Sequence, residues 1–108
     1  MECTFCKIIN KELPAEIHYE DDNMIVFEDI NPSAPIHLLI VPKKHIVSVN
    51  EMEEEDRDIM GEMFFVARKV AEKLGVKRSG YSLAVNVEKG GGQIVFHIHM
   101  HFLCNKKD

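Results

Sequence analysis

The sequence predicts an α+β domain in which an antiparallel sheet packs against one long helix. Two observations carry this prediction. Five short segments are rich in apolar and β-branched residues, and one stretch between the third and fourth segments has helical periodicity instead. The 108 residues suit a single domain over 1–108, and 45% hydrophobic with 29% charged residues is enough for a packed core.

The first three strands are expected ahead of the helix. Residues 16–21 are β-branched and aromatic enough for a short strand, and a polar turn leads into a second strand at 24–30. The third strand, 36–42, follows two prolines and is almost continuously apolar. Because such a strand is buried on both faces, it is expected in the middle of the sheet.

The helix is expected at 53–74, where apolar residues recur at i, i+3, i+4 and i+7. Acidic residues crowd its first turn, which complements the helix dipole, and Gly75 follows its last residue as a stop signal. The acidic run is therefore interpreted as a solvated helix N-terminus. Two further strands, 81–87 and 94–103, complete the sheet.

Charge and composition argue against several classes of protein. The net charge is −5 and the pI is about 5.6, whereas a general DNA or RNA binder carries a basic surface. The longest apolar runs are too short to span a bilayer, and the N-terminus has no signal-peptide layout. We therefore expect a cytoplasmic protein with no nucleic-acid or membrane partner. Three cysteines, an odd count, argue against a disulfide framework.

Three histidines at alternate positions are the strongest chemical signal in the chain. His97, His99 and His101 stand within the strand expected at 94–103, and alternate residues of a strand face the same way. The imidazoles would then form a row with neighbours about 7 Å apart. The opposite face is apolar and is expected to pack on the helix; it comprises Phe96, Ile98, Met100 and Phe102.

Two chemistries fit such a row of imidazoles. Neutral histidines are common metal ligands, but one imidazole can instead act as a nucleophile or acid–base group while the others position it. Gly90, Gly91 and Gly92 precede the histidines, and a glycine backbone can bring N–H groups close to an anion. An anion site beside histidines favours a phosphate held next to a nucleophile.

The histidine pattern resembles the His-φ-His-φ-His-φ-φ motif, with φ apolar, of the histidine triad family of nucleotide hydrolases and transferases. The stretches TFCKIINKELPAEIHYEDD, FEDINPSAPIHLLIVPKKH and VNVEKGGGQIVFHIHMH look like the branch that hydrolyses nucleoside phosphoramidates. The resemblance covers residues 3–103 in the family's order. It implies a five-stranded antiparallel sheet with one long helix and a short N-terminal helix.

The resemblance also implies a mechanism. His99, the middle histidine, would attack the α-phosphorus of a purine nucleotide such as an AMP derivative and displace an amine. The resulting nucleotidyl-histidine would be cleaved by water to the nucleoside monophosphate. His101 would bind the phosphate oxygens, His37 would support the triad and proton transfer, and His97 completes the catalytic set. No metal is required for this chemistry.

The nucleotide would be held by several parts of the chain. Asp29 matches the acidic residue that binds both ribose hydroxyls, because a carboxylate can accept two O–H bonds. The other matching positions are Asn86, Gly92, Gln93 and Ile94 around the phosphate, and Phe5, Ile8, Phe27 and Ile30 in an apolar purine slot. Without the resemblance, the four apolar residues would be read as core.

Cys3 and Cys6 have the spacing of half a zinc site. The resemblance to zinc-binding prokaryotic relatives implies that His45 and His97 complete a closed Cys₂His₂ site, and such a site is structural. The alternative is two buried free thiols.

The family resemblance implies a homodimer in which two five-stranded sheets merge into one of ten strands. The sequence is compatible with this, since the apolar arc of the helix is wider than one sheet face needs and includes Phe64, Phe65 and Val66. An apolar excess of this kind indicates an interface.

Two other functions stay open at this point. The three triad histidines could be catalytic zinc ligands, although no Asp or Glu follows them and the cysteines offer a metal a separate place. The chain could also be a nucleotide-binding module without turnover.

Overall fold

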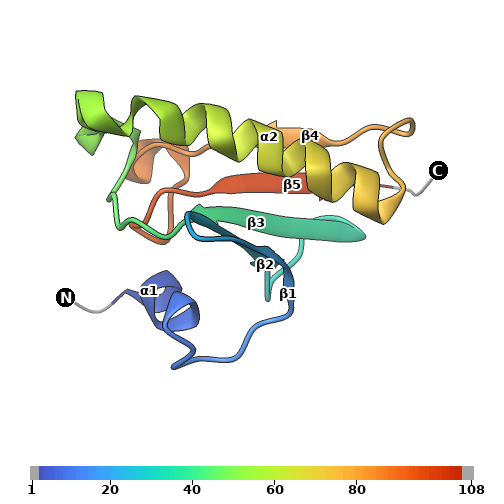
Figure 1. Cartoon of the computed structure of the whole chain (residues 1–108), viewed down its shortest axis with the longest axis horizontal. Helices are drawn as coiled ribbons and strands as arrows, with labels where there is room; N and C mark the ends of the chain where they lie inside the picture. The colour runs from blue at the N-terminus through green and yellow to red at the C-terminus, as the bar shows by residue number, and fades with distance from the viewer. Residues whose placement is uncertain (1–2, 106–108) are drawn as a thin grey trace.

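The computed structural model describes residues 3–105 of the chain and confirms the α+β fold (Figure 1). The helices are α1 (Thr4–Ile9) and α2 (Arg57–Leu74), and short 3-10 turns lie at Val49–Glu51, Glu54–Asp56 and Lys89–Gly91. The strands are β1 (Ile17–Glu20), β2 (Met24–Glu28), β3 (Ile36–Pro42), β4 (Ser82–Ala84) and β5 (Met100–Cys104). They form one antiparallel sheet in the order β1-β2-β3-β5-β4, so β3 is central as predicted.

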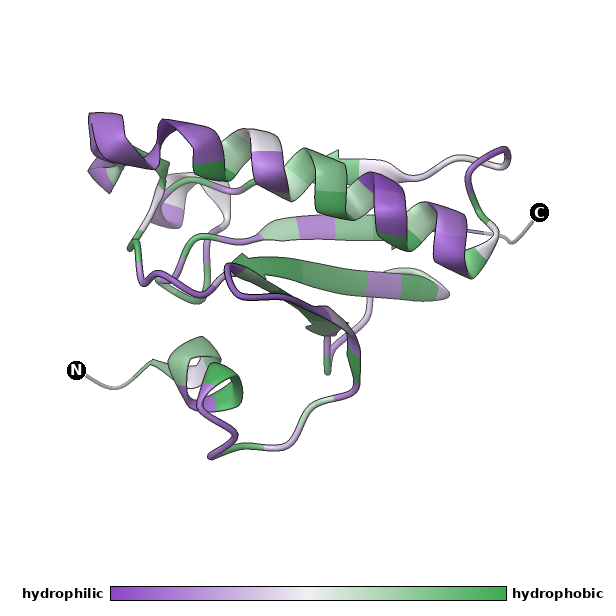
Figure 2. Ribbon diagram, viewed as in Figure 1, coloured by the Kyte–Doolittle hydropathy of each residue, from purple (hydrophilic) through white to green (hydrophobic). Residues whose placement is uncertain are grey.

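Helices cover both faces of the sheet, which explains why β3 is apolar at nearly every position. α2 lies along one face, and α1 lies on the other side of the sheet (Figure 1). Within β3, Leu38 and Ile40 pack with α2, whereas Leu39 and Val41 pack with α1. In Figure 2, β3 is mostly green (apolar), whereas green and purple segments alternate along α2, as in a helix with one face on the sheet and one in solvent. Burial of this kind stabilises the fold by about 25 cal/mol per Å² of apolar surface.

The long helix differs from the prediction at its start. Glu53 caps a 3-10 turn rather than opening the α-helix, and it exchanges hydrogen bonds with Asp56 in a capping box. The carboxylate of Asp56 also accepts a bond from Lys44. The regular helix then runs from Arg57 to Leu74, and Gly75 ends it with φ of 71°, a left-handed conformation that favours glycine.

The prediction of a long triad strand at 94–103 is wrong at its beginning. β5 starts only at Met100, and the residues before it turn away from the sheet. Ile98 donates its N–H to the carbonyl of Ile46 instead of joining a strand ladder. Met100 and Phe102 pack against α2 as expected, but the predicted core residue Phe96 is 42% exposed. The strands predicted at 24–30 and 81–87 are likewise shorter, ending at Glu28 and Ala84.

The outer surface of α2 carries the apolar excess seen in the sequence. Phe64 and Phe65 are 53% and 60% exposed, whereas Val66 is 3% exposed and belongs to the core. Of the three residues named in the wide apolar arc, Phe64 and Phe65 therefore make up the outward-facing excess, and Val66 does not. No helix within residues 3–105 is both long and apolar enough to cross a membrane.

Asp21 closes the turn between β1 and β2 with both carboxylate oxygens. Oδ1 accepts the N–H groups of Asn23 and Met24 at 2.7 and 2.8 Å, and Oδ2 accepts the Tyr19 hydroxyl at 2.7 Å. Burial raises the pKa of this carboxyl, but the hydrogen bonds to its charged form outweigh burial and hold the pKa below its usual value.

Replacing Asp21 by alanine is expected to lower the melting temperature at neutral pH by about 5 °C, because three donors lose a charged acceptor. The native pKa lies below the unfolded value of about 3.9, so the carboxylate stabilises fully above that pH. This stabilisation is lost as the pH falls through the native pKa. Thermal melts at decreasing pH should show the two proteins converging, and a gap that widens in acid would contradict this account.

Candidate active site

A cavity of about 330 Å³ opens on the side of the sheet that carries α1. Its wall is built from α1, the end of β2, β3, the glycine-rich loop and the triad segment. The residues that could do chemistry there are Asp29, His37, His99 and His101. The size fits a small-molecule ligand, since such sites measure about 300–1,000 Å³.

His99 is held as a neutral imidazole with one free nitrogen. Its Nδ1–H donates to the backbone carbonyl of His97 at 2.8 Å. Because a carbonyl oxygen only accepts, the proton must be on Nδ1, and Nε2 keeps its lone pair. The edge-to-face contact with the Phe5 ring, at 5.0 Å between centroids, fixes the plane of the imidazole. Burial lowers the pKa of His99 below its usual value, so the lone pair stays unprotonated at neutral pH.

A second hydrogen-bond chain fixes His101. The N–H of Ser33 donates to His37 Nδ1 at 2.9 Å, which places the proton of His37 on Nε2. That nitrogen lies 2.9 Å from His101 Nδ1 and 3.4 Å from a carboxylate oxygen of Asp29. His101 then accepts at Nδ1 and carries its own proton on Nε2, ready to donate to an anion. Burial lowers the pKa of His101, and the neighbouring His99 and His37 lower it further.

His97 does not join the other two rings. Its Nε2–H donates to the carbonyl of Pro42 at 2.7 Å, so Nδ1 has the lone pair. Nδ1 lies 3.4 Å from Cys3 Sγ, 3.6 Å from Cys6 Sγ and 3.1 Å from His45 Nδ1. The triad therefore splits, with His99 and His101 at the cavity and the ring of His97 in a separate cluster. His97 contributes its backbone carbonyl to the nucleophile candidate.

The four cluster residues fit a tetrahedral zinc ion. Their ligand atoms all lie within 4.8 Å of one another. A tetrahedron with Zn–S about 2.3 Å and Zn–N about 2.05 Å has S···N edges of about 3.5 Å and N···N edges of about 3.3 Å. The observed S···N distances of 3.4, 3.4 and 3.6 Å and the N···N distance of 3.1 Å are close to these values.

The thiol of Cys6 needs a nearby cation to ionise at neutral pH. Burial raises the pKa of Cys6 to about 11, with Cys3 adding to the effect. At neutral pH Cys6 would therefore be a neutral thiol, whereas a bound divalent cation stabilises a thiolate. The bond from His97 to Pro42 is the kind of outer contact that orients a metal-binding histidine.

The glycine-rich loop closes largely on itself. Gly92, with φ of 89°, donates its N–H to the carbonyl of Lys89 at 3.1 Å. Gln93 donates its N–H to the carbonyl of Glu88 at 3.1 Å. Ile94 directly follows the loop. Its N–H donates to no backbone carbonyl within residues 3–105, so this N–H is available to a ligand.

The remaining predicted nucleotide contacts are placed as follows. Asn86 donates its side-chain amide to the carbonyl of Gly91 and so shapes the loop. Gln93 is buried, and its amide donates to Val47 and Val95 rather than facing the cavity. Ile94 borders the cavity and is 87% exposed.

The expected purine slot is only partly enclosed. Phe5, Ile8 and Phe27 are buried, line the cavity and belong to the core beneath α1, so they are both core and wall. Ile30 also borders the cavity, but it is 91% exposed and lies at the rim rather than in the slot. Asp29 borders the cavity as well, and its Oδ1 accepts the N–H of Asn31 at 2.8 Å, which makes it a turn residue too.

Sequence reasoning missed the groups that orient the histidines. The N–H of Ser33 and the carbonyl of Pro42 fix two of the imidazoles, yet backbone groups carry no residue-type signal. Leu39 also lines the cavity, and its place on the α1 face of β3 could have been found from the strand alternation.

Comparisons with known proteins show which proteins the chain resembles. Residues 2–108 match the family model described as "Scavenger mRNA decapping enzyme C-term binding". The chain is 46% identical over 102 residues to a purine nucleoside phosphoramidase from Escherichia coli (strain K12), covering 94% of this chain and 86% of that protein.

Solved structures show the same similarity. A HIT family hydrolase from Legionella pneumophila Philadelphia 1 superposes with a TM-score of 0.93 at 44% identity, covering 98% of this chain and 95% of that one. A zinc-bound histidine triad family protein from Mycobacterium smegmatis superposes with a TM-score of 0.83 at 33% identity, covering 98% and 76%. The chain therefore belongs to the histidine triad (HIT) family.

Proposed function

We propose that the protein is a hydrolase that cleaves purine nucleoside 5′-phosphoramidates through a covalent intermediate on His99. The observation that carries the proposal is the hydrogen bond from His99 Nδ1–H to the carbonyl of His97. It leaves a lone pair on Nε2 of a buried, neutral imidazole at the cavity. The similarity to a purine nucleoside phosphoramidase supports the choice of substrate class.

The reaction would proceed in two displacements at phosphorus. His99 Nε2 attacks the α-phosphorus, a P–N bond to the imidazole forms, and the P–N bond to the leaving amine breaks as the amine takes up a proton. Water then attacks the same phosphorus and gives up a proton, which replaces the one that the amine took. The bond to His99 breaks, and nucleoside monophosphate is released with the imidazole neutral again. His101 Nε2–H and the N–H of Ile94 would donate to the phosphate oxygens, where negative charge builds up.

The charges around the cavity favour a substrate with little negative charge. Of the residues known to line the cavity, none is Lys or Arg, whereas Glu28 and Asp29 are carboxylates. Neutral imidazole and backbone donors suit the single charge of a phosphoramidate better than the several charges of a polyphosphate. Asp29 would accept the ribose hydroxyls, and the wall of Phe5 and Phe27 would receive the purine.

The site geometry bears on one of the two alternative functions and not on the other. A zinc enzyme with the three triad histidines as ligands is disfavoured, because the ring of His97 faces the cysteines and His99 Nδ1 is already engaged. A binding module without turnover would use the same cavity, so only an activity measurement separates it from the hydrolase.

We further propose that Cys3, Cys6, His45 and His97 hold a structural zinc ion. The distances among the four ligand atoms and the tautomer of His97 support this site. A zinc ion there would fasten α1, which contains Cys6 and is capped by Cys3, to the segment that precedes β5. The zinc-bound relative from Mycobacterium smegmatis supports zinc as the metal.

The exposed Phe64 and Phe65 support the homodimer as a further proposal, with α2 at the interface. Sedimentation at micromolar concentration is expected to give twice the monomer mass, and Phe65→Asp is expected to shift the protein to monomer, because a charge would be buried against an apolar partner. Wild type that sediments as a monomer at this concentration would exclude the proposal.

The test of the function is direct. Wild-type protein incubated with adenosine 5′-phosphoramidate should release AMP in a buffer that contains neither chelator nor added metal. Binding of AMP with no turnover of this substrate would favour the binding module.

A further inference from the structure

Glu88 has a backbone conformation that needs an explanation. Its φ of 62° and ψ of 172° lie in a region where residues other than glycine are rarely found. Strained residues of this kind persist only where surrounding contacts hold them, and they gather at functional sites. Glu88 starts the loop 88–93, which borders the cavity at Gly92.

The strained conformation lets Glu88 hold both ends of the loop. Its carbonyl accepts the N–H groups of Gly91 at 3.0 Å and Gln93 at 3.1 Å. Its own N–H donates to Gln93 Oε1 at 2.8 Å. The hydrogen bonds that close the loop are therefore made by a single residue, Glu88.

Side chains then tie the closed loop to a buried segment. The hydroxyl of Ser48, which is fully buried, donates to the carboxylate of Glu88. The amide of Gln93 donates to the carbonyl of Val47 at 2.7 Å. Buried polar groups are costly unless paired, so both links constrain the loop strongly.

The same segment also supports the nucleophile candidate. The carbonyl of Ile46 accepts the N–H of Ile98 at 2.7 Å, one residue before His99. Residues 46–48 are thus the common support of the loop that faces the phosphate and of the imidazole that would attack it. The side chain of Glu88 itself does not line the cavity, so any effect on chemistry must act through the loop.

We propose that Glu88, through its bond with Ser48, is a positioning residue that keeps loop 88–93 and the N–H of Ile94 in register with His99. The inference rests on the proposed phosphoryl-transfer function. It predicts that contacts to the phosphate depend on the Glu88–Ser48 bond, whereas contacts to the nucleoside do not.

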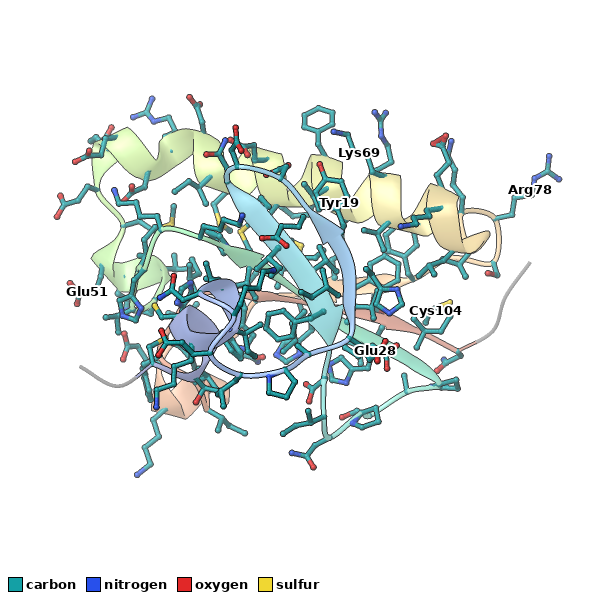
Figure 3. All side chains as sticks on the ribbon, turned by 60° about the horizontal axis from the view of Figure 1, so that its bottom comes forward. Tyr19, Glu28, Glu51, Lys69, Arg78 and Cys104 are labelled. Carbon is teal, nitrogen blue, oxygen red and sulfur yellow. The ribbon has the colours of Figure 1, made fainter. Side chains whose placement is uncertain are left out.

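Three substitutions at Glu88 separate positioning from stability. Glu88→Ala removes the acceptor for Ser48 and keeps the strained backbone. Glu88→Gly removes the same acceptor but suits a positive φ, so its melting temperature should lie above that of the alanine variant. Glu88→Gln keeps an oxygen that can accept from Ser48. Glu51→Gln is the matched control. Glu51 lies on the 3-10 turn Val49–Glu51, which Ser48 caps, and its side chain points away from the body of the molecule (Figure 3).

The measurements are kcat and KM for adenosine 5′-phosphoramidate, dissociation constants for AMP and adenosine, and melting temperature. Both Glu88→Ala and Glu88→Gly should lose roughly 10- to 100-fold in kcat, since a displaced oxyanion donor costs that much or more. Both should bind AMP more weakly and adenosine as wild type does. Glu88→Gln and Glu51→Gln should stay within about threefold of wild type.

Two results would overturn the inference while leaving the hydrolase intact: wild-type kcat in Glu88→Gly, or equal weakening of AMP and adenosine binding. If the wild-type protein does not hydrolyse adenosine 5′-phosphoramidate, the proposed function is wrong. The binding comparison would still decide the inference in that case, because selective weakening of AMP requires a loop that faces the phosphate.

Discussion

Replacement of His99 by alanine is expected to lower kcat for adenosine 5′-phosphoramidate by roughly 10⁴-fold or more, with little change in AMP affinity. The reason is that His99 is, among the described histidines at the cavity, the one whose lone pair accepts no hydrogen bond, and its removal leaves the purine and phosphate contacts in place. Steady-state kinetics and calorimetric binding of AMP measure the two quantities. Acid-sensitive labelling of wild type, but not of the variant, by the nucleotide would identify the covalent intermediate.

The matched control for this experiment is His18→Ala. His18 is paired with Glu28 on the sheet surface, 2.8 Å away, and is not among the residues that line the cavity. Its loss should leave kcat unchanged, and both variants should show the circular dichroism of the folded protein. A folded His99→Ala protein with most of its activity would show that the nucleophile has been assigned to the wrong residue.

Removal of the metal is expected to have the second large effect. The purified protein should contain one zinc ion per chain, and Cys6→Ser should contain far less. Loss of the ion should lower the melting temperature by roughly 10–20 °C, because a ligand present at 1,000 times its dissociation constant stabilises by about 4 kcal/mol. Zinc content by elemental analysis and thermal melts provide the readouts, independent of activity.

Nucleotide binding should weaken along with the melting temperature. Phe5, in α1, lies between Cys3 and Cys6 in the sequence. Its ring contacts the His99 ring and the Phe27 ring, with centroids 5.0 and 5.4 Å apart. If α1 loosens, the wall of the cavity is lost, and AMP affinity should fall roughly tenfold.

Cys104→Ser is the control for the metal experiment, since Cys104 is a buried cysteine on β5 outside the cluster. It should keep one zinc ion per chain. Equal zinc content in wild type and in Cys6→Ser would contradict the assigned ligand set, and a metal-free wild type with normal stability would leave the two buried thiols as the better interpretation.

Local sequence patterns predicted the sheet and helix well because those elements follow side-chain periodicity. The continuous apolar run of β3 identified the central strand, and the spacing of apolar residues identified α2. The same reasoning failed before Met100. Alternation of apolar and histidine residues at 94–99 imitates a strand, but the bonds that keep this segment out of the sheet come from Ile46 and Pro42, more than forty residues away.

The sequence by itself determined which side chains with useful chemistry this protein has: three alternating histidines, a paired cysteine motif and a glycine-rich loop. The tertiary structure decided which of these side chains lie together and which role each can take. His97 turns toward Cys3 and Cys6 while His99 and His101 remain at the cavity. The physical reason is that an imidazole has two similar nitrogens, and the partner of one decides what the other can do. Those partners are carbonyl and N–H groups from distant segments, which only the folded chain brings within hydrogen-bonding distance.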